Sequence, residues 1–376
     1  MKRIAIFCDG TWNHADAEYG TNVVALSQAT SLTAGQTFQQ LIYIPGLGTD
    51  SGASWLSRNI DRLGGGAFGW GLDAKIETAY RALAYSYQPG DDIFIFGFSR
   101  GAYTARSLAG LIRSCGIPTR NKINMVRDAM DYYRSRDTNS HPNDTKSYAF
   151  RLTINPEIAT SPEEQDWRRG QGRDPGLLLQ IAYLGVWDTV GALGVPGYYR
   201  GLAKLFNKQY QFHDADLSRS VRSARHAVAI DERRRTFPPT LWDNLDKLND
   251  GASVENRLYR QLWFPGDHGS VGGGGDIAGL SDNALVWIAE GAEAAGLEFL
   301  PGTLDGFRRQ IDDFAPLHNR SDPKKGIFDS LTSHGDRDGP KTVENLAPAT
   351  RHRWKEARPA YRPKTLERIK ADLDRD

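Results

Sequence analysis

Five short apolar runs along the chain predict β-strands. Several of them are nearly continuous in apolar residues instead of alternating with polar ones, which is the pattern of parallel strands covered on both faces of a sheet. The five runs are RIAIFC (3–8), QLIYIP (40–45), DIFIFG (92–97), IAYLGVW (181–187) and LYRQLWF (258–264).

Helical patterns lie between these runs. In segments 72–90 and 99–116, apolar or small residues recur at intervals of three and four, and the patterns end at turns that contain glycine and proline, 89–90 and 116–118. Segments 218–232 and 282–296 also show a helical pattern. The alternation of strands and helices predicts an α/β fold with a mostly parallel central sheet and helices on both faces.

Two stretches depart from this alternation. Residues 118–178 are polar and rich in turn formers, which predicts an insertion that is either a lid or cap over the sheet or a solvated surface excursion. Residues 311–376 carry many charges and several prolines, which predicts a C-terminal extension that packs on the domain or trails from it. We therefore expect one α/β domain over residues 1–310, with the insertion inside it.

Composition narrows the class of protein. The chain has 376 residues, of which 25% are charged and 39% apolar, as in a soluble globular protein. Its net charge of +1 provides no field that attracts nucleic acid, so we expect no nucleic-acid partner. Cys8 and Cys115 are too few for a disulfide framework or a cysteine-based zinc site, and we expect neither a metal nor another cofactor.

The chain also lacks the patterns of membrane insertion. No apolar run reaches the ~18 residues of a transmembrane helix. The N-terminus enters a predicted strand at once and does not resemble a signal peptide. These features predict a cytoplasmic protein, with export by a route that needs no cleaved signal left open.

The stretch GFSRG, residues 97–101, follows a predicted strand and opens a predicted helix. A nucleophile elbow of the G-x-S-x-G type requires this context. The sharp turn needs small residues on both sides of Ser99, and it places the serine oxygen next to the helix N-terminus. Because a glycine-flanked serine can also be only a helix cap, the interpretation requires a catalytic base nearby.

Two later segments provide partners for Ser99, in the chain order Ser–Asp–His that enzymes with this elbow use. Asp188 ends the predicted strand 181–187, and His268 follows the predicted strand 258–264 in a glycine-rich loop. Open α/β sheets build their sites at the carboxyl ends of strands. We therefore predict that Ser99 is the nucleophile, His268 the base and Asp188 the acid.

Rivals for both partners remain. His226 is the rival base, and it lies inside the helical pattern of residues 218–232. The rival acids are Asp267, Asp276 and Asp282.

The first predicted strand ends at Asp9-Gly10-Thr11. We predict that a backbone N–H of Gly10 or Thr11 joins the N–H of Arg100 in an oxyanion hole. Asp9 either belongs to the site or caps a turn. In an alternative mechanism, Asp9 binds a metal ion together with the aspartate and histidine named above, although no H-x-x-x-H spacing supports it.

Two further patterns are candidates for binding. The stretch LGGGAFGWG (63–71) lacks the phosphate-loop signature, and we interpret it as a flexible loop near the site. The stretch AIDERRRTFPP (229–239) contains three consecutive arginines, which are typical of a solvated or ion-paired face. Contact with an anionic headgroup or phosphate is the alternative.

The chain resembles the α/β-hydrolase-domain family that includes type VI secretion lipase (phospholipase) effectors. The resemblance spans about residues 3 to 290. In one position the chain departs from it, because the family's histidine motif more often reads HSDVGGG and here reads HGSVGGG, with Ser270 at the aspartate position. The matching stretches, in the expected order, are FCDGTWN, YIPGLGT, GFSRGAYTAR, GVWDTVGALG, HAVAIDERRRTFPP and WFPGDHGSVGGG.

This resemblance implies an α/β-hydrolase-like fold and a serine esterase or phospholipase with Ser99 as nucleophile. It favours a lipid or phospholipid ester as substrate, transient contact with a membrane, and an immunity or secretion partner. Three alternatives stay open: hydrolysis of small-molecule or polymer esters by the same mechanism, metal-dependent hydrolysis, and a member of the fold that binds without catalysis.

Overall fold

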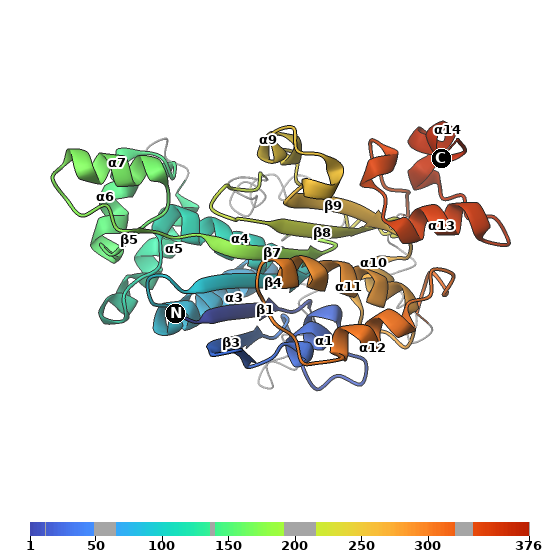
Figure 1. The fold of residues 1–376 in the computed structure, drawn as a ribbon, viewed down its shortest axis with the longest axis horizontal. Helices are drawn as coiled ribbons and strands as arrows, with labels where there is room; N and C mark the ends of the chain where they lie inside the picture. The colour runs from blue at the N-terminus through green and yellow to red at the C-terminus, as the bar shows by residue number, and fades with distance from the viewer. Residues whose placement is uncertain (12, 49–64, 136–139, 192–215, 320–333, 376) are drawn as a thin grey trace.

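The computed structural model describes residues 1–11, 13–48, 65–135, 140–191, 216–319 and 334–375. Its centre is a seven-stranded sheet in the order β2-β3-β1-β4-β7-β8-β9 (Figure 1). The short edge strand β2 pairs antiparallel with β3, and all other neighbours are parallel. The strands are β1 Arg3–Cys8, β2 Thr33–Ala34, β3 Thr37–Ile44, β4 Asp92–Phe98, β7 Ile181–Trp187, β8 Ala224–Ala229 and β9 Tyr259–Phe264, with a separate pair, β5 Ile158–Ala159 and β6 Leu177–Leu178.

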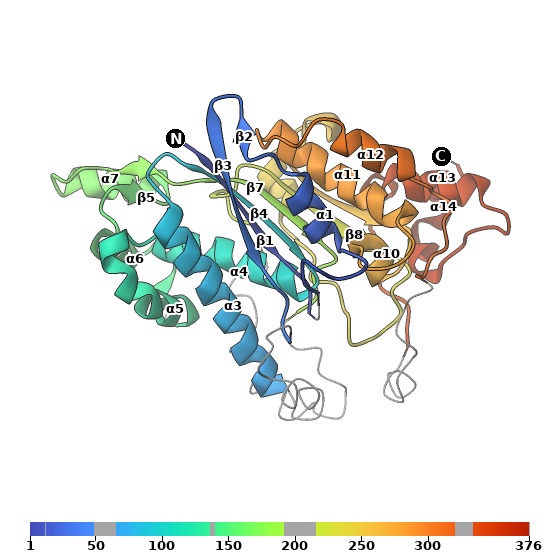
Figure 2. The same cartoon turned by 90° about the horizontal axis from the view of Figure 1, so that it is seen from below.

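Helices cover both faces of the central sheet (Figures 1 and 2). The α-helices are α1 Asn22–Ala29, α3 Gly65–Ser86, α4 Arg100–Cys115, α5 Val126–Arg134, α6 Thr145–Ile154, α7 Pro162–Gly170, α9 Leu245–Asn249, α10 His268–Gly272, α11 Gly279–Ala294, α12 Thr303–Gln310, α13 Pro348–Glu356 and α14 Lys370–Leu373. Short 3-10 turns are η1 Arg120–Met125, η4 Val254–Asn256, η5 Val343–Asn345 and η6 Lys364–Ile369. None of the helices in the described ranges has both the length and the hydropathy to span a bilayer.

Strand β1 shows how one strand contributes to two cores. Ile4 and Ile6 join a buried cluster with residues of α3 and α4. Ala5 and Phe7 point the other way and join a second cluster with residues of α1 and α11. Since successive side chains of a strand alternate between faces, a sheet with two covered faces favours apolar residues at most positions. This preference explains the nearly continuous apolar runs of the sequence.

All five predicted strands are present, and the helices over 72–90, 99–116 and 282–296 are confirmed with shifted ends. The helix predicted over 218–232 is wrong, because this segment contains the strand β8, which lies between β7 and β9. Five of the six residues of β8 are buried. The alanines of ARHAVA favour a helix in isolation, but pairing and burial between two strands override that weak preference.

The glycine-rich stretch also differs from its prediction. We predicted a flexible loop over 63–71, yet α3 begins at Gly65, and only residues 63 and 64 lie outside the described part. The glycine-rich start of α3 leads into a part of the helix with buried side chains, beginning with Leu72, which is 2% exposed. Packing of the apolar stripe of α3 against the sheet thus extends a helix through glycines that disfavour it.

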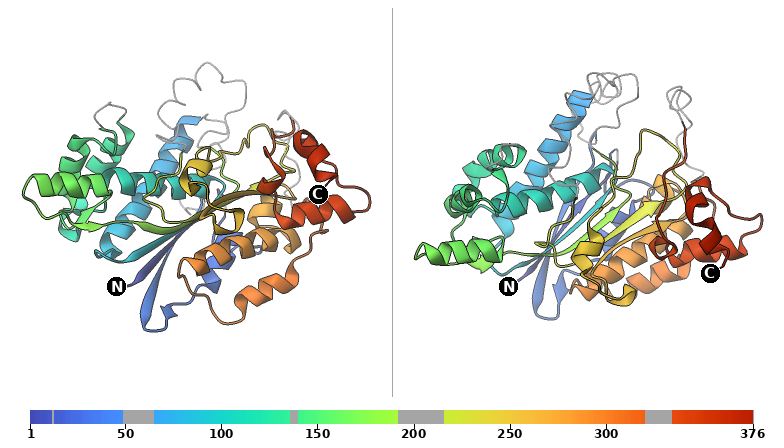
Figure 3. Two further views of the ribbon diagram at one scale, coloured as in Figure 1. Left: turned by 45° about the horizontal axis from the view of Figure 1, so that its top comes forward. Right: turned by 90° about the horizontal axis from the view of Figure 1, so that it is seen from above.

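The described part of the insertion packs against the C-terminal half of α4 (Figure 3). Arg151 of α6 donates to the Ser114 carbonyl at 2.8 Å, and Asn155 donates to the Ile117 carbonyl at 3.0 Å. Helix α4 has 16 residues and is therefore about 24 Å long, with Ser99 at its other end. In the described part of the insertion, these helices therefore contact the end of α4 that is far from Ser99.

The C-terminal extension packs on the β9 edge of the sheet (Figure 1). Trp354, Leu366 and other residues of the extension form a third buried cluster with Val228 of β8 and Trp263 of β9. Thr350 donates to the Trp263 carbonyl at 2.8 Å. In its described part, the extension is therefore an integral layer of the fold.

Candidate active site

Ser99 lies at the tip of a sharp turn between β4 and α4. Its backbone has φ 58° and ψ −121°, a strained conformation for a residue with a side chain. The flanking glycines are required by close packing. A Cβ at Gly97 would lie 2.4 Å from the Gly101 carbonyl oxygen, and a Cβ at Gly101 would lie 2.1 Å from the Cys8 carbonyl oxygen. The turn therefore has the geometry of the predicted elbow.

Two strand ends bring the predicted partners to Ser99. The Nε2 atom of His268 lies 2.8 Å from the Ser99 hydroxyl oxygen, and its Nδ1 atom lies 2.6 Å from Oδ2 of Asp188. His268 is the first residue of α10, after β9, and Asp188 directly follows β7 with φ 36°. All three residues are buried, and Asp188 is fully inaccessible to solvent. The arrangement can transfer a proton from the hydroxyl to the imidazole while a carboxylate orients the ring.

Asp188 is held by more donors than the histidine alone. The backbone N–H of Ala229 donates to its Oδ1 at 3.0 Å, and the guanidinium of Arg337 donates to Oδ1 at 2.7 Å and to Oδ2 at 3.0 Å. Burial opposes a charged carboxylate here, but the Arg337 guanidinium and the His268 hydrogen bond outweigh it. Together they hold the pKa of Asp188 well below its usual range.

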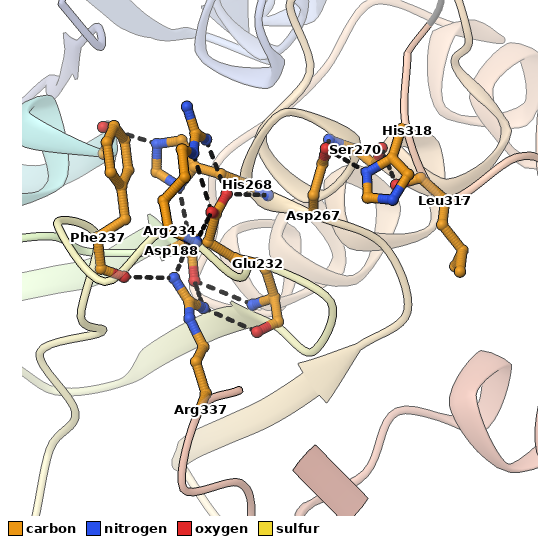
Figure 4. Close-up of polar contacts among 12 residues, drawn as sticks. Asp188, Glu232, Arg234, Phe237, Asp267, His268, Ser270, Leu317, His318 and Arg337 are labelled. Atoms are coloured by element: carbon orange, nitrogen blue, oxygen red, sulfur yellow. Dashed lines mark hydrogen bonds and ion pairs between the residues drawn. The ribbon is translucent and has the colours of Figure 1, made fainter. Parts of the chain in front are cut away.

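Two aromatic rings and a second carboxylate lie around His268, and Figure 4 labels two of these neighbours, Phe237 and Glu232. Its ring centroid lies 4.6 Å from that of Phe98 and 5.0 Å from that of Phe237. The backbone N–H of His268 donates to Glu232 at 3.3 Å, and Glu232 in turn binds Arg234 at 2.7 Å. Burial favours the neutral form of Glu232, but hydrogen bonds and charge from Arg234 outweigh it and lower the pKa of this carboxyl. The imidazole is thus fixed both at its ring and at its backbone.

The predicted oxyanion donors lie beside the serine. A Cβ at Gly10 would lie 3.4 Å from the Ser99 Cβ, so the Gly10 backbone lies beside the nucleophile. The Gly10 N–H, however, donates to Oδ1 of Asp9 at 2.7 Å and is occupied in this structure. Thr11 and Arg100 line one cavity, and within the described residues the buried Thr11 hydroxyl has no hydrogen-bond partner. Neither Ser99 nor His268 is among the residues that line this cavity, so the cavity itself does not place a donor at the serine oxygen.

Asp9 organises this loop instead of joining the three buried residues. Its carboxylate accepts from the Thr21 hydroxyl at 2.8 Å and the Tyr43 hydroxyl at 2.6 Å, in addition to Gly10. Burial raises the pKa of this carboxyl even though these hydrogen bonds oppose the shift. In the described part of the chain, no three metal-binding side chains converge as a metal site. The metal-binding set that we considered is therefore not assembled.

The rival base and acids occupy other positions. His226 lies in β8, where its Nε2 accepts from the Thr189 N–H at 3.2 Å and its Nδ1 lies 2.9 Å from Gln261. Burial lowers the pKa of His226 to about 3, which keeps the imidazole neutral. Its role is to support the turn that carries the Asp188 side chain.

The rival acids likewise lie outside the hydrogen-bonded set. Asp267 caps α10 by accepting from the Ser270 N–H at 2.9 Å, and it binds His318 at 2.7 Å. Asp276 lies in the turn between α10 and α11, and Asp282 lies in the first turn of α11. Burial raises the pKa of Asp282 to about 6, and no hydrogen bond among the described residues links it to the imidazole at the site.

Sequence reasoning did not find Glu232 or Arg337. Glu232 lies in the stretch AIDERRRTFPP, where Arg234 pairs with it and Arg233 pairs with Asp336 at 3.3 Å. The prediction of an ion-paired arginine face is confirmed for these two arginines. Arg337 lies 149 residues after the carboxylate it binds. No local pattern in the sequence connects the two.

Comparison with known proteins identifies the family of this chain. Residues 2–291 match the family described as type VI secretion system (T6SS) phospholipase effector Tle1-like, catalytic domain. Uncharacterized protein YEL023C of Saccharomyces cerevisiae is 28% identical over 244 residues, which are 63% of this chain and 32% of the yeast protein. The chain thus spans about a third of the length of this curated relative.

Two solved structures are similar at lower identity. The crystal structure of an uncharacterized Pseudomonas aeruginosa protein matches with a TM-score of 0.43 and 18% identity, over 81% of this chain and 48% of that chain. The Tle1 effector bound to the VgrG spike of the type VI secretion system matches with a TM-score of 0.36 and 17% identity, over 74% of this chain and 53% of that chain. This chain therefore covers about half of each solved chain.

Proposed function

The chain belongs to the family of Tle1-like phospholipase effector catalytic domains of the type VI secretion system, and from this premise we propose that it is a serine hydrolase of the α/β-hydrolase type. It cleaves carboxylic esters of lipids or phospholipids through an acyl-enzyme on Ser99. The observation that carries the proposal is the buried chain of two hydrogen bonds, 2.8 Å from Ser99 to His268 and 2.6 Å from His268 to Asp188.

The first half of the reaction forms the acyl-enzyme. Nε2 of His268 takes the proton of the Ser99 hydroxyl as the oxygen attacks the ester carbonyl carbon. Asp188 accepts a hydrogen bond from the Nδ1–H of the imidazole, remains a carboxylate, and stabilises the positive charge that develops on the ring. The protonated imidazole then donates its Nε2 proton to the leaving alkoxide, which departs as an alcohol.

Negative charge on the tetrahedral carbonyl oxygen needs fixed donors. In our proposal, the N–H of Arg100 at the first position of α4 supplies one donor, aided by the positive end of the helix dipole. The loop at Thr11 supplies a second donor, since the Gly10 N–H is held by Asp9. Removing one such donor typically costs about 10²–10³ in kcat.

The second half of the reaction repeats this chemistry with water. His268 takes a proton from the water as it attacks the acyl carbon, and Ser99 recovers the proton when the carboxylic acid leaves. No step requires a metal ion or an organic cofactor.

Family membership leads us to propose a lipid or phospholipid ester as substrate and transient contact with a membrane. We also propose synthesis in the cytoplasm, delivery as a type VI effector with a secretion partner, and an immunity partner. Hydrolysis of small soluble esters by the same residues is an outcome of the test below.

The test compares hydrolysis by wild type, Ser99→Ala and Ser107→Ala. Ser107 is a matched control, since it is a buried serine on the same helix that does not face the imidazole. Substrates are p-nitrophenyl esters of short and long chains, together with a labelled phospholipid in vesicles. We expect turnover by wild type and Ser107→Ala, loss of turnover in Ser99→Ala, and a preference for long chains and phospholipid.

Each other outcome changes a specific part of the proposal. Turnover that survives Ser99→Ala would remove Ser99 as nucleophile. If that residual turnover is abolished by a chelator, a metal-bound water is the nucleophile. Turnover restricted to short soluble esters would retain the mechanism and replace the lipid substrate.

A further inference from the structure

We propose that Arg337 is a positioning residue of the active site, which keeps Asp188 ionised and aimed at His268. This inference rests on the proposed serine-hydrolase function and deepens it. Arg337 lies beyond residues 2–291, the span that matches the family's catalytic domain. The C-terminal extension would then complete a site whose three predicted reacting residues all come from the matched domain.

The guanidinium makes a two-pronged contact with the carboxylate (Figure 4). Nη1 of Arg337 donates to Oδ1 of Asp188 at 2.7 Å, and Nη2 donates to Oδ2 at 3.0 Å. Nη1 also donates to the Ala229 carbonyl at 2.7 Å, and Nη2 to the Phe237 carbonyl at 2.8 Å. The Arg337 side chain is 5% exposed and is therefore buried in the interior of the protein.

Asp188 needs a counter-charge at this position. Its side chain has no exposure to solvent, and without a cation burial would favour the neutral acid. A neutral acid could not stabilise the imidazolium that forms during attack. Because Arg337 contacts both oxygens, it fixes the plane of the carboxylate while leaving Oδ2 directed at Nδ1 of His268.

The chain holds Arg337 in place from both sides. Before it, an isolated antiparallel bridge joins His334 to Arg234, and the Gly335 N–H donates to the Arg233 carbonyl at 2.9 Å. After it, the backbone turns at Gly339, where φ is 73° and a Cβ would lie 1.8 Å from the Thr365 carbonyl oxygen. Such anchoring fits a residue whose orientation matters.

Arg337 also acts on the wall around the imidazole. It binds the carbonyl of Phe237, whose ring meets the His268 ring edge-on with an interplanar angle of 75°. The same guanidinium thus contacts both the Asp188 carboxylate and the backbone of Phe237, whose ring packs on His268. Within the described residues, Glu232, Arg234 and the buried His226 are further titratable or charged groups near His268 or its acid.

The test measures kcat/KM for p-nitrophenyl butyrate from pH 4 to pH 9 in wild type, Arg337→Gln and Arg337→Lys. For Arg337→Gln we expect a loss of roughly 10²-fold at pH 7, smaller than the ~10⁴-fold known for loss of a triad aspartate. Because removal of the opposite charge raises the pKa of Asp188, Arg337→Gln should lose activity at higher pH than wild type on the acid side of the profile. Arg337→Lys should recover part of the loss, since it restores the charge without the fork.

Arg353→Gln is the matched control. Arg353 is an arginine of the same extension that donates to the Asp313 and Ala315 carbonyls at 2.8 Å, away from the site. Its removal should lower the melting temperature and leave the pH profile in place. A profile for Arg337→Gln that keeps its acid limb, with activity reduced only in proportion to the folded fraction, would assign Arg337 a purely structural role and overturn the proposal.

A second readout needs no turnover. The Nδ1 proton of an imidazole that donates to a carboxylate resonates far downfield in proton NMR, and it can be followed during acid titration. In wild type this resonance should persist to lower pH than in Arg337→Gln. Equal loss in both proteins would contradict the role of Arg337, whereas a failed ester assay with the expected NMR difference would contradict only the proposed function.

Discussion

Two buried arginine–carboxylate clusters lie in different parts of the protein, one in the insertion and one at the candidate active site. In the insertion, Glu164 binds Arg151 at 2.7 Å and also binds Arg168, and all three side chains are at most 1% exposed. At the site, Asp188 binds Arg337 with similar burial. Both clusters are built from the same groups in a similarly dry environment, so chemistry and burial alone do not distinguish them.

The third partner distinguishes the two clusters. Asp188 also accepts a hydrogen bond from an imidazole that reaches a serine, whereas Glu164 accepts from the Thr160 N–H at 2.9 Å, which closes a local turn. Glu164 lies 13 residues or fewer from both of its arginines, and Asp188 lies 149 residues from Arg337. A buried ion pair is therefore evidence of function only when one of its atoms remains directed at a reactive group.

The largest effect is expected for Asp188→Asn. It removes the acceptor of the His268 Nδ1 proton, favours the wrong tautomer and leaves Arg337 without its carboxylate. We expect kcat to fall by about 10⁴, as for the equivalent change in other triads. Steady-state hydrolysis of a p-nitrophenyl ester measures it, with Asp313→Asn as a control on an aspartate bound to His352. A fall in kcat of less than tenfold would show that Asp188 is not the acid of the catalytic triad.

Glu164→Gln should break the other cluster. It leaves two buried arginines without the carboxylate they share, and such uncompensated burial costs about 3–5 kcal/mol. Urea unfolding should show this loss, while kcat/KM of the folded protein stays at the wild-type value. A large fall in kcat/KM would mean that the insertion acts on the site and that the clusters are not separate.

His226 tests whether a buried imidazole beside the site stays neutral in the folded protein. Its pKa is lowered to about 3 in the folded protein, mainly by burial. The unfolded chain therefore binds a proton that the folded chain does not, and stability is lost as pH falls from about 6.5 toward 3. Between pH 7 and pH 5, wild type should lose about 2 kcal/mol more than His226→Gln in denaturant titrations. Equal losses would contradict a neutral buried imidazole.

The smallest effect is expected at the surface. Arg308 pairs with Glu290 at 3.2 Å and Asp305 at 2.8 Å, and its side chain is 41% exposed. Solvent screens such pairs, so Arg308→Gln should change the free energy of unfolding by about 0–1 kcal/mol. Thermal unfolding at two salt concentrations measures this change. A loss of unfolding free energy above ~2 kcal/mol would show that an exposed ion pair can stabilise the protein as strongly as a buried one.

Local patterns in the sequence were sufficient to predict much of the fold and to select the candidate residues. The continuous apolar runs predicted the main parallel strands, since burial on both faces leaves no polar positions. Gly97 and Gly101 predicted the elbow, because backbone atoms occupy the space of their missing side chains. Asp188 and His268 could be chosen because carboxyl ends of parallel strands meet at one edge of the sheet.

Long-range contacts account for what was missed. The strand β8 is rich in alanine, and only its position between β7 and β9 identifies it as a strand. Arg337 lies in a charged stretch whose composition resembles a solvated tail. Its place beside Asp188 depends on pairing between segments about a hundred residues apart, which no local period reveals.

The most direct test of the account is covalent labelling of Ser99. Wild type, Ser99→Ala and Ser107→Ala would be treated with a fluorophosphonate, digested and examined by mass spectrometry. We predict one phosphonylated serine in the peptide that contains Ser99, labelled in wild type and Ser107→Ala and absent in Ser99→Ala. Label on another residue, or equal labelling of Ser99→Ala, would contradict the assignment of Ser99 as the nucleophile.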